Sequence, residues 1–102
     1  MKNVTEGFKM FIDETEGVGE TFMKAVMKQA SESCLDKKVH ELAYISVLVA
    51  EGMNGGLPFH IKRAKSLGAS YDEVKSAILV PMPVIGIKVA EALPFLKSYN
   101  VE

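Results

Sequence analysis

Apolar residues recur at steps of three and four along most of the chain, which is the spacing typical of amphipathic helices. Alternating apolar and polar runs bounded by turn residues, which would indicate strands, are absent. The spacing predicts six helices, near residues 4–15, 19–32, 36–50, 57–67, 71–79 and 83–98. We therefore expect one all-α domain over residues 1–102, with no sheet.

Capping signals mark several ends of these helices. Ser33 and Asp36 form a short S-x-x-D signature ahead of the third helix, and Ser70 and Glu73 form a capping box for the fifth. Pro94 predicts a kink or a restart within the sixth helix, because proline lacks a backbone N–H.

The third helix is apolar on nearly every side from Leu42 to Ala50, a pattern that predicts a central, buried helix. Apolar residues make up 48% of the 102 residues. A chain this short buries only about 60–65% of its unfolded surface. A single copy would therefore leave apolar surface exposed, and we expect a homo-oligomer.

Composition excludes several functional classes. A net charge of −1 argues against a protein built mainly to bind nucleic acid. A lone cysteine cannot form an internal disulfide. No run reaches the roughly 18 consecutive apolar residues of a membrane span, and the first residues, MKNVTEGFK, lack a hydrophobic signal core. We expect no membrane association and a cytoplasmic location.

Glu41 and His60 are the candidate catalytic residues. Glu41 lies near the start of the third helix and His60 on the fourth, so antiparallel packing of these helices would bring the two together. A carboxylate that orients an imidazole is a general acid/base device. A buried Glu–His hydrogen bond that only satisfies two polar groups is the alternative. Lys62 and Arg63 follow His60 and would attract an anionic substrate, unless they only form a solvated helix face.

Other reactive side chains are less informative. Cys34 precedes the third helix, where a helix N-terminus can activate a thiol, but we favour a small, buried or half-buried side chain. His40-Glu41 is not followed by a second histidine, so the H-E-x-x-H zinc motif is absent. We expect no metal and no cofactor.

Residues 35–80 resemble the carboxymuconolactone decarboxylase family, which includes alkyl hydroperoxidase D-like proteins. The resemblance is carried by Glu41-Leu42, Gly52, His60, Ala64, Gly68-Ala69-Ser70 and Glu73-Val74. It implies an alkyl hydroperoxidase D-like helical fold and a ring-like homo-oligomer, trimeric or hexameric. It also implies that Glu41 and His60 correspond to the proton relay of the redox members.

The chain departs from both well-understood branches of that family. The redox members carry a C-x-x-C pair ahead of the histidine, where this chain has Met53 and Gly56. Without two thiols there is no disulfide cycle, so peroxidase activity is not expected. The lactone decarboxylases use a histidine at the His60 position and tend to have an acidic residue a few positions ahead of it. This chain has Gly56 and Leu57 there; Leu57 fits their pattern and Gly56 does not.

Three hypotheses follow. The first is an acid/base enzyme for a small carboxylated lactone or keto acid, in which His60 moves the proton, Glu41 orients His60, and Lys62 or Arg63 steers the anion. The second is a non-enzymatic oligomer that binds a small molecule or a protein partner. The third, which we rank last, is a thiol enzyme that uses Cys34.

Overall fold

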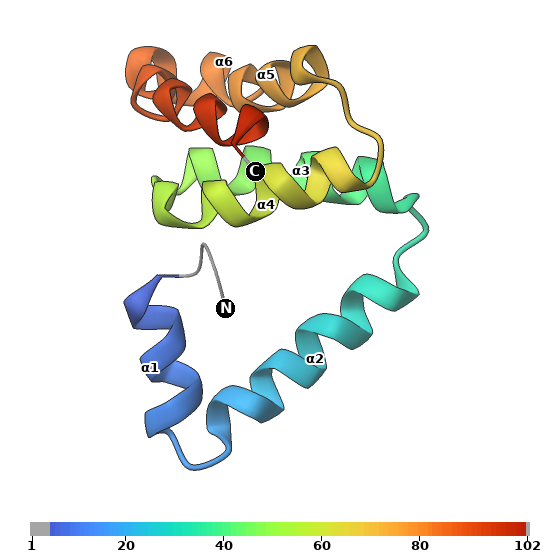
Figure 1. Ribbon diagram of the computed structural model, residues 1–102, viewed down its shortest axis with the longest axis vertical. Helices are drawn as coiled ribbons and strands as arrows, with labels where there is room; N and C mark the ends of the chain where they lie inside the picture. Colours follow the sequence, from blue (N-terminus) through green and yellow to red (C-terminus); the bar gives the residue numbers. More distant parts are fainter. Residues whose placement is uncertain (1–4, 102) are drawn as a thin grey trace.

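Helices make up nearly all the secondary structure of residues 5–101, the part of the chain that the computed structural model describes (Figure 1). In chain order they are α1 (Glu6–Glu14), α2 (Val18–Glu32), α3 (Lys37–Ala50), η1 (Asn54–Gly56), α4 (Leu57–Ser66), α5 (Tyr71–Leu79), α6 (Met82–Ile85), η2 (Gly86–Glu91) and η3 (Leu93–Asn100). Within these residues no strand is present, which confirms the predicted all-α class.

The helices form three tiers (Figure 1). Helices α3 and α4 form the middle tier, α5 to η3 cover one side of it, and the α1–α2 hairpin lies on the other side. The core lies between the middle tier and the α5–η3 tier, where α3 packs on α5 and α4 packs on η3. Its largest fully buried side chains are Ile45, Leu57, Ile61, Val74 and Ile78.

The start of α3 differs from the predicted cap in one respect. Asp36, in extended conformation, is the N-cap, and its carboxylate accepts a hydrogen bond from the Val39 amide at 3.0 Å. Ser33 is instead the C-cap of α2, and its hydroxyl accepts from the Leu35 amide at 3.2 Å. The S-x-x-D interpretation was therefore wrong about Ser33, because Asp36 is the residue whose side chain caps α3, through the amide of its third residue.

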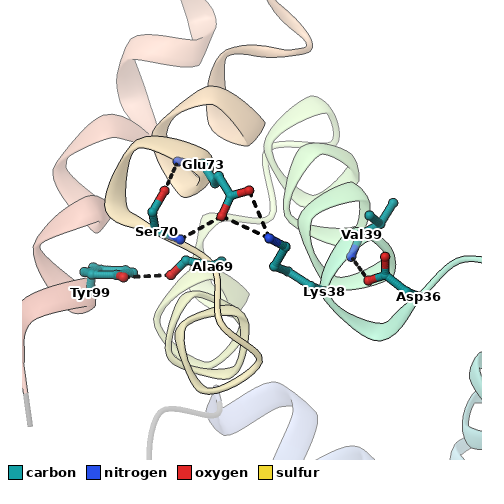
Figure 2. A network of polar contacts seen from close by, with 7 residues as sticks. All are labelled: Asp36, Lys38, Val39, Ala69, Ser70, Glu73 and Tyr99. Atoms are coloured by element: carbon teal, nitrogen blue, oxygen red, sulfur yellow. Dashed lines mark hydrogen bonds and ion pairs between the residues drawn. The ribbon is translucent and has the colours of Figure 1, made fainter.

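The predicted capping box of α5 is confirmed (Figure 2). The Ser70 hydroxyl accepts from the Glu73 amide at 3.0 Å, and the Glu73 carboxylate accepts from the Ser70 amide at 2.9 Å. Lys38 of α3 also donates to Glu73, with Nζ 3.1 Å from Oε2. In the same region, the Tyr99 hydroxyl donates to the Ala69 carbonyl at 2.7 Å. These contacts join α3, α5 and η3 at one end of the core.

The contacts of Glu73 make the stability of the α3–α5 pairing dependent on pH. The hydrogen bond from the Ser70 backbone, and then that from Lys38, hold the pKa of the Glu73 carboxyl below its ordinary value. The stabilisation is therefore complete above the ordinary carboxyl pKa of about 4.3 and is lost as pH falls through the lowered value. Glu73→Gln should have a lower urea midpoint than wild type at pH 7, and the difference should shrink on acidification to pH 3.

Glu91→Gln, an exposed carboxylate on η2, is the matched control and should track wild type across the same pH range. A difference between Glu73→Gln and wild type that grows as pH falls would contradict the assigned role of this carboxylate.

The C-terminal segment is broken more often than the predicted single helix. Helix α6 ends at Gly86, whose φ of +66° and ψ of −145° belong to a region that glycine alone adopts readily. Helix η3 then begins at Leu93 with Pro94 in its first turn, which confirms the predicted restart. Helices η2 and η3 are both 3-10 helices. Side-chain periodicity predicted one continuous helix here, and the backbone conformation of Gly86 interrupts it.

Helix α3 is not buried on every side, contrary to the prediction. Its buried residues are Glu41, Ile45 and Val49, which lie one turn apart on a single face. Tyr44 and Val47 are exposed. The reason is that α4 and α5 pack on one part of the helix surface, and among residues 5–101 no element packs comparably on the rest.

Helices α1 and α2 form a hairpin that packs chiefly on itself. Gly19 is its single buried residue among those the structure describes. A Cβ at Gly19 would lie 2.6 Å from the Phe11 carbonyl oxygen, so the close approach of the two helices requires glycine there. The rings of Phe11 and Phe22 meet edge to face, with centroids 5.8 Å apart.

Over residues 5–101, no single helix is long and apolar enough to cross a membrane. One broken pair, residues 71–91 with 93–100, meets the requirement by length and composition only, and it is bent by 75°.

Candidate active site

The candidate site lies where α3 and α4 face each other. Glu41 projects from the first turns of α3, while His60 and Arg63 lie one turn apart on α4. At the other end of α3, Leu48 lies against Gly56, the residue before α4. These two contact points show that the helices run antiparallel, with the short η1 turn between them. This is the packing that the sequence argument required.

Glu41 is the single buried charged residue in the described part of the chain, and its side chain is only 6% exposed. One carboxylate oxygen, Oε2, is hydrogen-bonded to His60 Nδ1. The other, Oε1, accepts a hydrogen bond from Arg63 Nε at 3.2 Å. Both oxygens of the buried carboxylate are thus engaged, as a charge removed from water requires.

The hydrogen bond to Glu41 determines which nitrogen of His60 carries the proton. An ionised carboxylate only accepts hydrogen bonds, so Nδ1 must donate. In the neutral ring Nε2 then has the free lone pair. The His60 side chain is 20% exposed, so it is not sealed within the core. His60 is therefore arranged to take a proton at Nε2, or to return one from it, while Nδ1 stays bonded.

Two aromatic rings hold the imidazole. The Tyr44 ring, on α3, stacks on His60 with centroids 4.1 Å apart and planes 22° apart. The Phe59 ring meets it edge to face at 5.1 Å. With Tyr44 stacked on it, Phe59 against it and Nδ1 bonded, the ring is restrained, which is the pre-organisation that a proton-transfer group needs.

A scan against protein-family models matches residues 16–98 to the carboxymuconolactone decarboxylase family. The chain belongs to the carboxymuconolactone decarboxylase family. No curated protein and no solved structure matches it significantly. The matched range extends well beyond residues 35–80, on which the resemblance was first based, and includes all of α2 to α6.

In this carboxymuconolactone decarboxylase family protein, Arg63 makes a contact that its sequence position did not predict. The sequence placed it among residues that attract a substrate anion, and the structure places its Nε on Glu41. Its side chain is 52% exposed, so the guanidinium also reaches the surface beside His60. Lys62 is half-buried on the same helix. A role for either in substrate binding stays a prediction.

Cys34 is exposed in the loop between α2 and α3, so the expectation of a buried or half-buried thiol was wrong. Cys34 follows Ser33, the C-cap of α2, and precedes Asp36, the N-cap of α3, so it belongs to neither helix. In residues 5–101, no three His, Cys, Asp or Glu side chains gather to hold a metal ion. Met53 and Gly56, which stand at the positions of the redox cysteines, are the N-cap and the last residue of η1, ahead of α4.

Two grooves on the surface include neither Glu41 nor His60 in their walls. The larger, of ≈ 580 Å³, lies between α3 and α5, and the other lies at the tip of the α1–α2 hairpin. Sequence reasoning missed that Tyr44 stacks on His60. The signal was present, because Tyr44 follows Glu41 by three residues and so projects from the same side of α3.

Proposed function

We propose that this carboxymuconolactone decarboxylase family protein is an acid/base enzyme acting on a small carboxylated lactone or keto acid. The observation that carries the proposal is the buried Glu41 carboxylate, which is bonded at once to His60 Nδ1 and to Arg63 Nε. A carboxylate that holds the back of an imidazole is the arrangement of a general acid/base pair. Family membership alone supports the class of protein, and not this activity or a substrate.

For a decarboxylation, the C–CO₂⁻ bond breaks and its electron pair moves into the neighbouring carbonyl-conjugated system, releasing CO₂. The carbon that lost the carboxylate then takes a proton from Nε2 of protonated His60. Glu41 stabilises the imidazolium before this transfer, because its negative charge is held at Nδ1. For proton removal next to a carbonyl, the neutral ring acts in the opposite direction, with Nε2 as the base.

Substrate binding in this proposal uses the positive charge on α4. Arg63 lies one turn beyond His60 on the same side of α4, and Lys62 adds a further positive charge to the helix, so a substrate carboxylate drawn to Arg63 would lie close to the His60 ring. Helix α4 carries no acidic residue to oppose that charge. Electrostatic attraction therefore favours a carboxylated substrate over a neutral one.

One observation favours a second candidate, a non-enzymatic binding protein. Two surface grooves lie away from Glu41 and His60, and the larger of these two has mostly apolar walls. In that case the Glu41–His60–Arg63 cluster would only satisfy buried polar groups, and the protein would bind a partner through another surface.

A substrate panel separates the two candidates. We expect turnover of one or more small carboxylated lactones or 3-oxo acids, measured as CO₂ release or ring opening. The methyl esters of the same compounds should show no comparable turnover. Lys62→Gln should raise KM for the carboxylated compound by about threefold to fivefold, which corresponds to the loss of about 0.6–1 kcal/mol from one surface charge. Lys65→Gln, on the same helix outside this cluster, is the matched control.

Equal rates on acids and esters would contradict anion recognition by α4. The absence of turnover across the whole panel would favour the binding protein.

A further inference from the structure

The hydroxyl group of Tyr44 is not used in the packing of the chain. The Tyr44 ring stacks on the His60 imidazole with centroids 4.1 Å apart, a contact that a phenylalanine ring would also make. Within residues 5–101 the hydroxyl has no hydrogen-bond partner, and the side chain is 38% exposed. By contrast, the Tyr99 hydroxyl donates to the Ala69 carbonyl at 2.7 Å (Figure 2). The Tyr44 hydroxyl is therefore a donor that is available to a ligand.

Tyr44 lies on the same side of α3 as Glu41, because three residues separate the two along the helix. Glu41 holds Nδ1 of His60, so the Nε2 edge of the ring is the one left for a ligand. The Tyr44 hydroxyl lies one bond beyond a ring whose centre is 4.1 Å from the centre of the imidazole. A ligand of several atoms that contacts the Nε2 edge is therefore large enough to reach this hydroxyl as well.

The other polar groups of the site already have roles. Both carboxylate oxygens of Glu41 are bonded, and an ionised carboxylate only accepts hydrogen bonds. In the proposed function, Nε2 of His60 serves the reacting carbon, and the positive charge of Lys62 and Arg63 attracts the substrate carboxylate. The Tyr44 hydroxyl is the donor of this site that has no assigned role.

Decarboxylation creates a need for such a donor. When the C–CO₂⁻ bond breaks, its electron pair moves onto the neighbouring carbonyl oxygen, which becomes an enolate oxyanion. A hydrogen-bond donor placed at that oxygen stabilises the transition state, because the negative charge develops there. The roles proposed for His60 and for the positive charge on α4 leave this oxygen without a donor.

We propose that the Tyr44 hydroxyl donates a hydrogen bond to the carbonyl oxygen of the substrate as negative charge develops on it. The phenol keeps its own proton throughout. The electron pair returns from the oxygen to the carbon when the carbon takes a proton from Nε2 of protonated His60. Tyr44 is thus a further catalytic residue, and this inference rests on the proposed acid/base function.

Tyr44→Phe tests the inference, because it removes the hydroxyl and keeps the ring. The variant should lower kcat by about 10–100-fold on the substrate that wild type turns over, somewhat less than the loss of an oxyanion donor in a fully enclosed site. Nitrogen-15 NMR should show the same Nδ1–H tautomer of His60 in variant and wild type, since the stacking contact is retained. Tyr71→Phe is the matched control and should keep wild-type kcat, because Tyr71 is 40% exposed and its edge-to-face contact with Tyr99 needs no hydroxyl.

Two kinetic outcomes would overturn the inference. Wild-type kcat in Tyr44→Phe would show that the hydroxyl has no role, and the proposed function would stand. A lower kcat accompanied by a changed His60 tautomer would show that Tyr44 acts only through the imidazole ring, as a packing contact.

A binding experiment provides the test if no substrate of the panel is turned over, an outcome that counts against the proposed function itself. The probe is oxalate, a planar dianion that resembles a carboxylated enolate, added to protein labelled with carbon-13 at the tyrosine Cζ atoms. Oxalate should shift the Tyr44 resonance and not that of Tyr99, whose hydroxyl is already bonded. Tyr44→Phe should weaken oxalate binding by about fivefold to tenfold. An unmoved Tyr44 resonance, or equal oxalate affinity in the variant, would overturn the role of the hydroxyl.

Discussion

Replacing His60 by glutamine should lower turnover of the carboxylated substrate by about 10²–10⁴-fold, the contribution of a positioned acid/base group. Glutamine keeps a polar group of similar reach next to Glu41, and it fills much of the space beside Tyr44 and Phe59. Its amide cannot take up or release a proton near neutral pH. The loss should therefore appear in kcat, measured as CO₂ release or ring opening, with KM little changed.

The other histidine provides the control. His40 lies next to Glu41 in sequence and projects from a different side of α3. His40→Gln should keep wild-type turnover, and both variants should keep the helical circular dichroism of the parent. If His60→Gln retains wild-type kcat on the same substrate, His60 is not the proton-transfer group and the acid/base mechanism fails.

The Glu41–His60 contact could be predicted from sequence because two helices joined by a short glycine-containing turn pack antiparallel. The antiparallel direction was therefore predictable, but the register was not: Glu41 lies nine residues before the end of α3, and His60 only three residues after the start of α4. The Arg63 contact follows from the same geometry, since Arg63 lies one turn beyond His60 on the same face. It was missed because a charge next to a candidate active site was interpreted only through its effect on substrate.

Two errors about the fold have a shared physical cause. Periodicity reports how much apolar surface a helix presents, and it does not report whether one chain can cover that surface. Helix α3 presents apolar side chains all round, and a single chain buries only the face with Glu41, Ile45 and Val49. The last segment was predicted as one helix because its side chains keep helical spacing, whereas Gly86 breaks it through backbone conformation.

Helix α3 and the α1–α2 hairpin both leave apolar side chains exposed in a single chain. Composition predicted more apolar surface than one copy buries, and the structure shows exposed apolar side chains on α1–α2, on α3, and at Val84 and Ile87. Glu41, His60 and Arg63 instead form a polar cluster between α3 and α4. Substitutions at the exposed apolar residues can therefore leave that cluster intact.

Replacing Glu41 by glutamine should lower turnover by about 100-fold by changing the tautomer of His60. Arg63 has hydrogen-bond donors only, so the single amide oxygen of the introduced side chain would face Arg63 Nε. The amide NH₂ would then face His60 Nδ1, which must become an acceptor, and the ring proton would move to Nε2. A neutral ring with its proton at Nε2 lacks the free lone pair there, as in other orienting-carboxylate variants. Nitrogen-15 NMR of the imidazole measures this directly, with His40 as an internal reference.

A double variant separates this positioning role from a loss of packing. In Glu41→Gln with Arg63→Met, no donor competes for the amide oxygen, so the oxygen can turn back to accept from Nδ1–H of His60. The Nδ1–H tautomer should therefore return, although the buried carboxylate is still absent. Loss of packing alone would leave the tautomer the same in the single and double variants. An unchanged Nδ1–H tautomer in Glu41→Gln would show that Arg63 does not control the orientation of this side chain, and the three-residue arrangement would then be only structural.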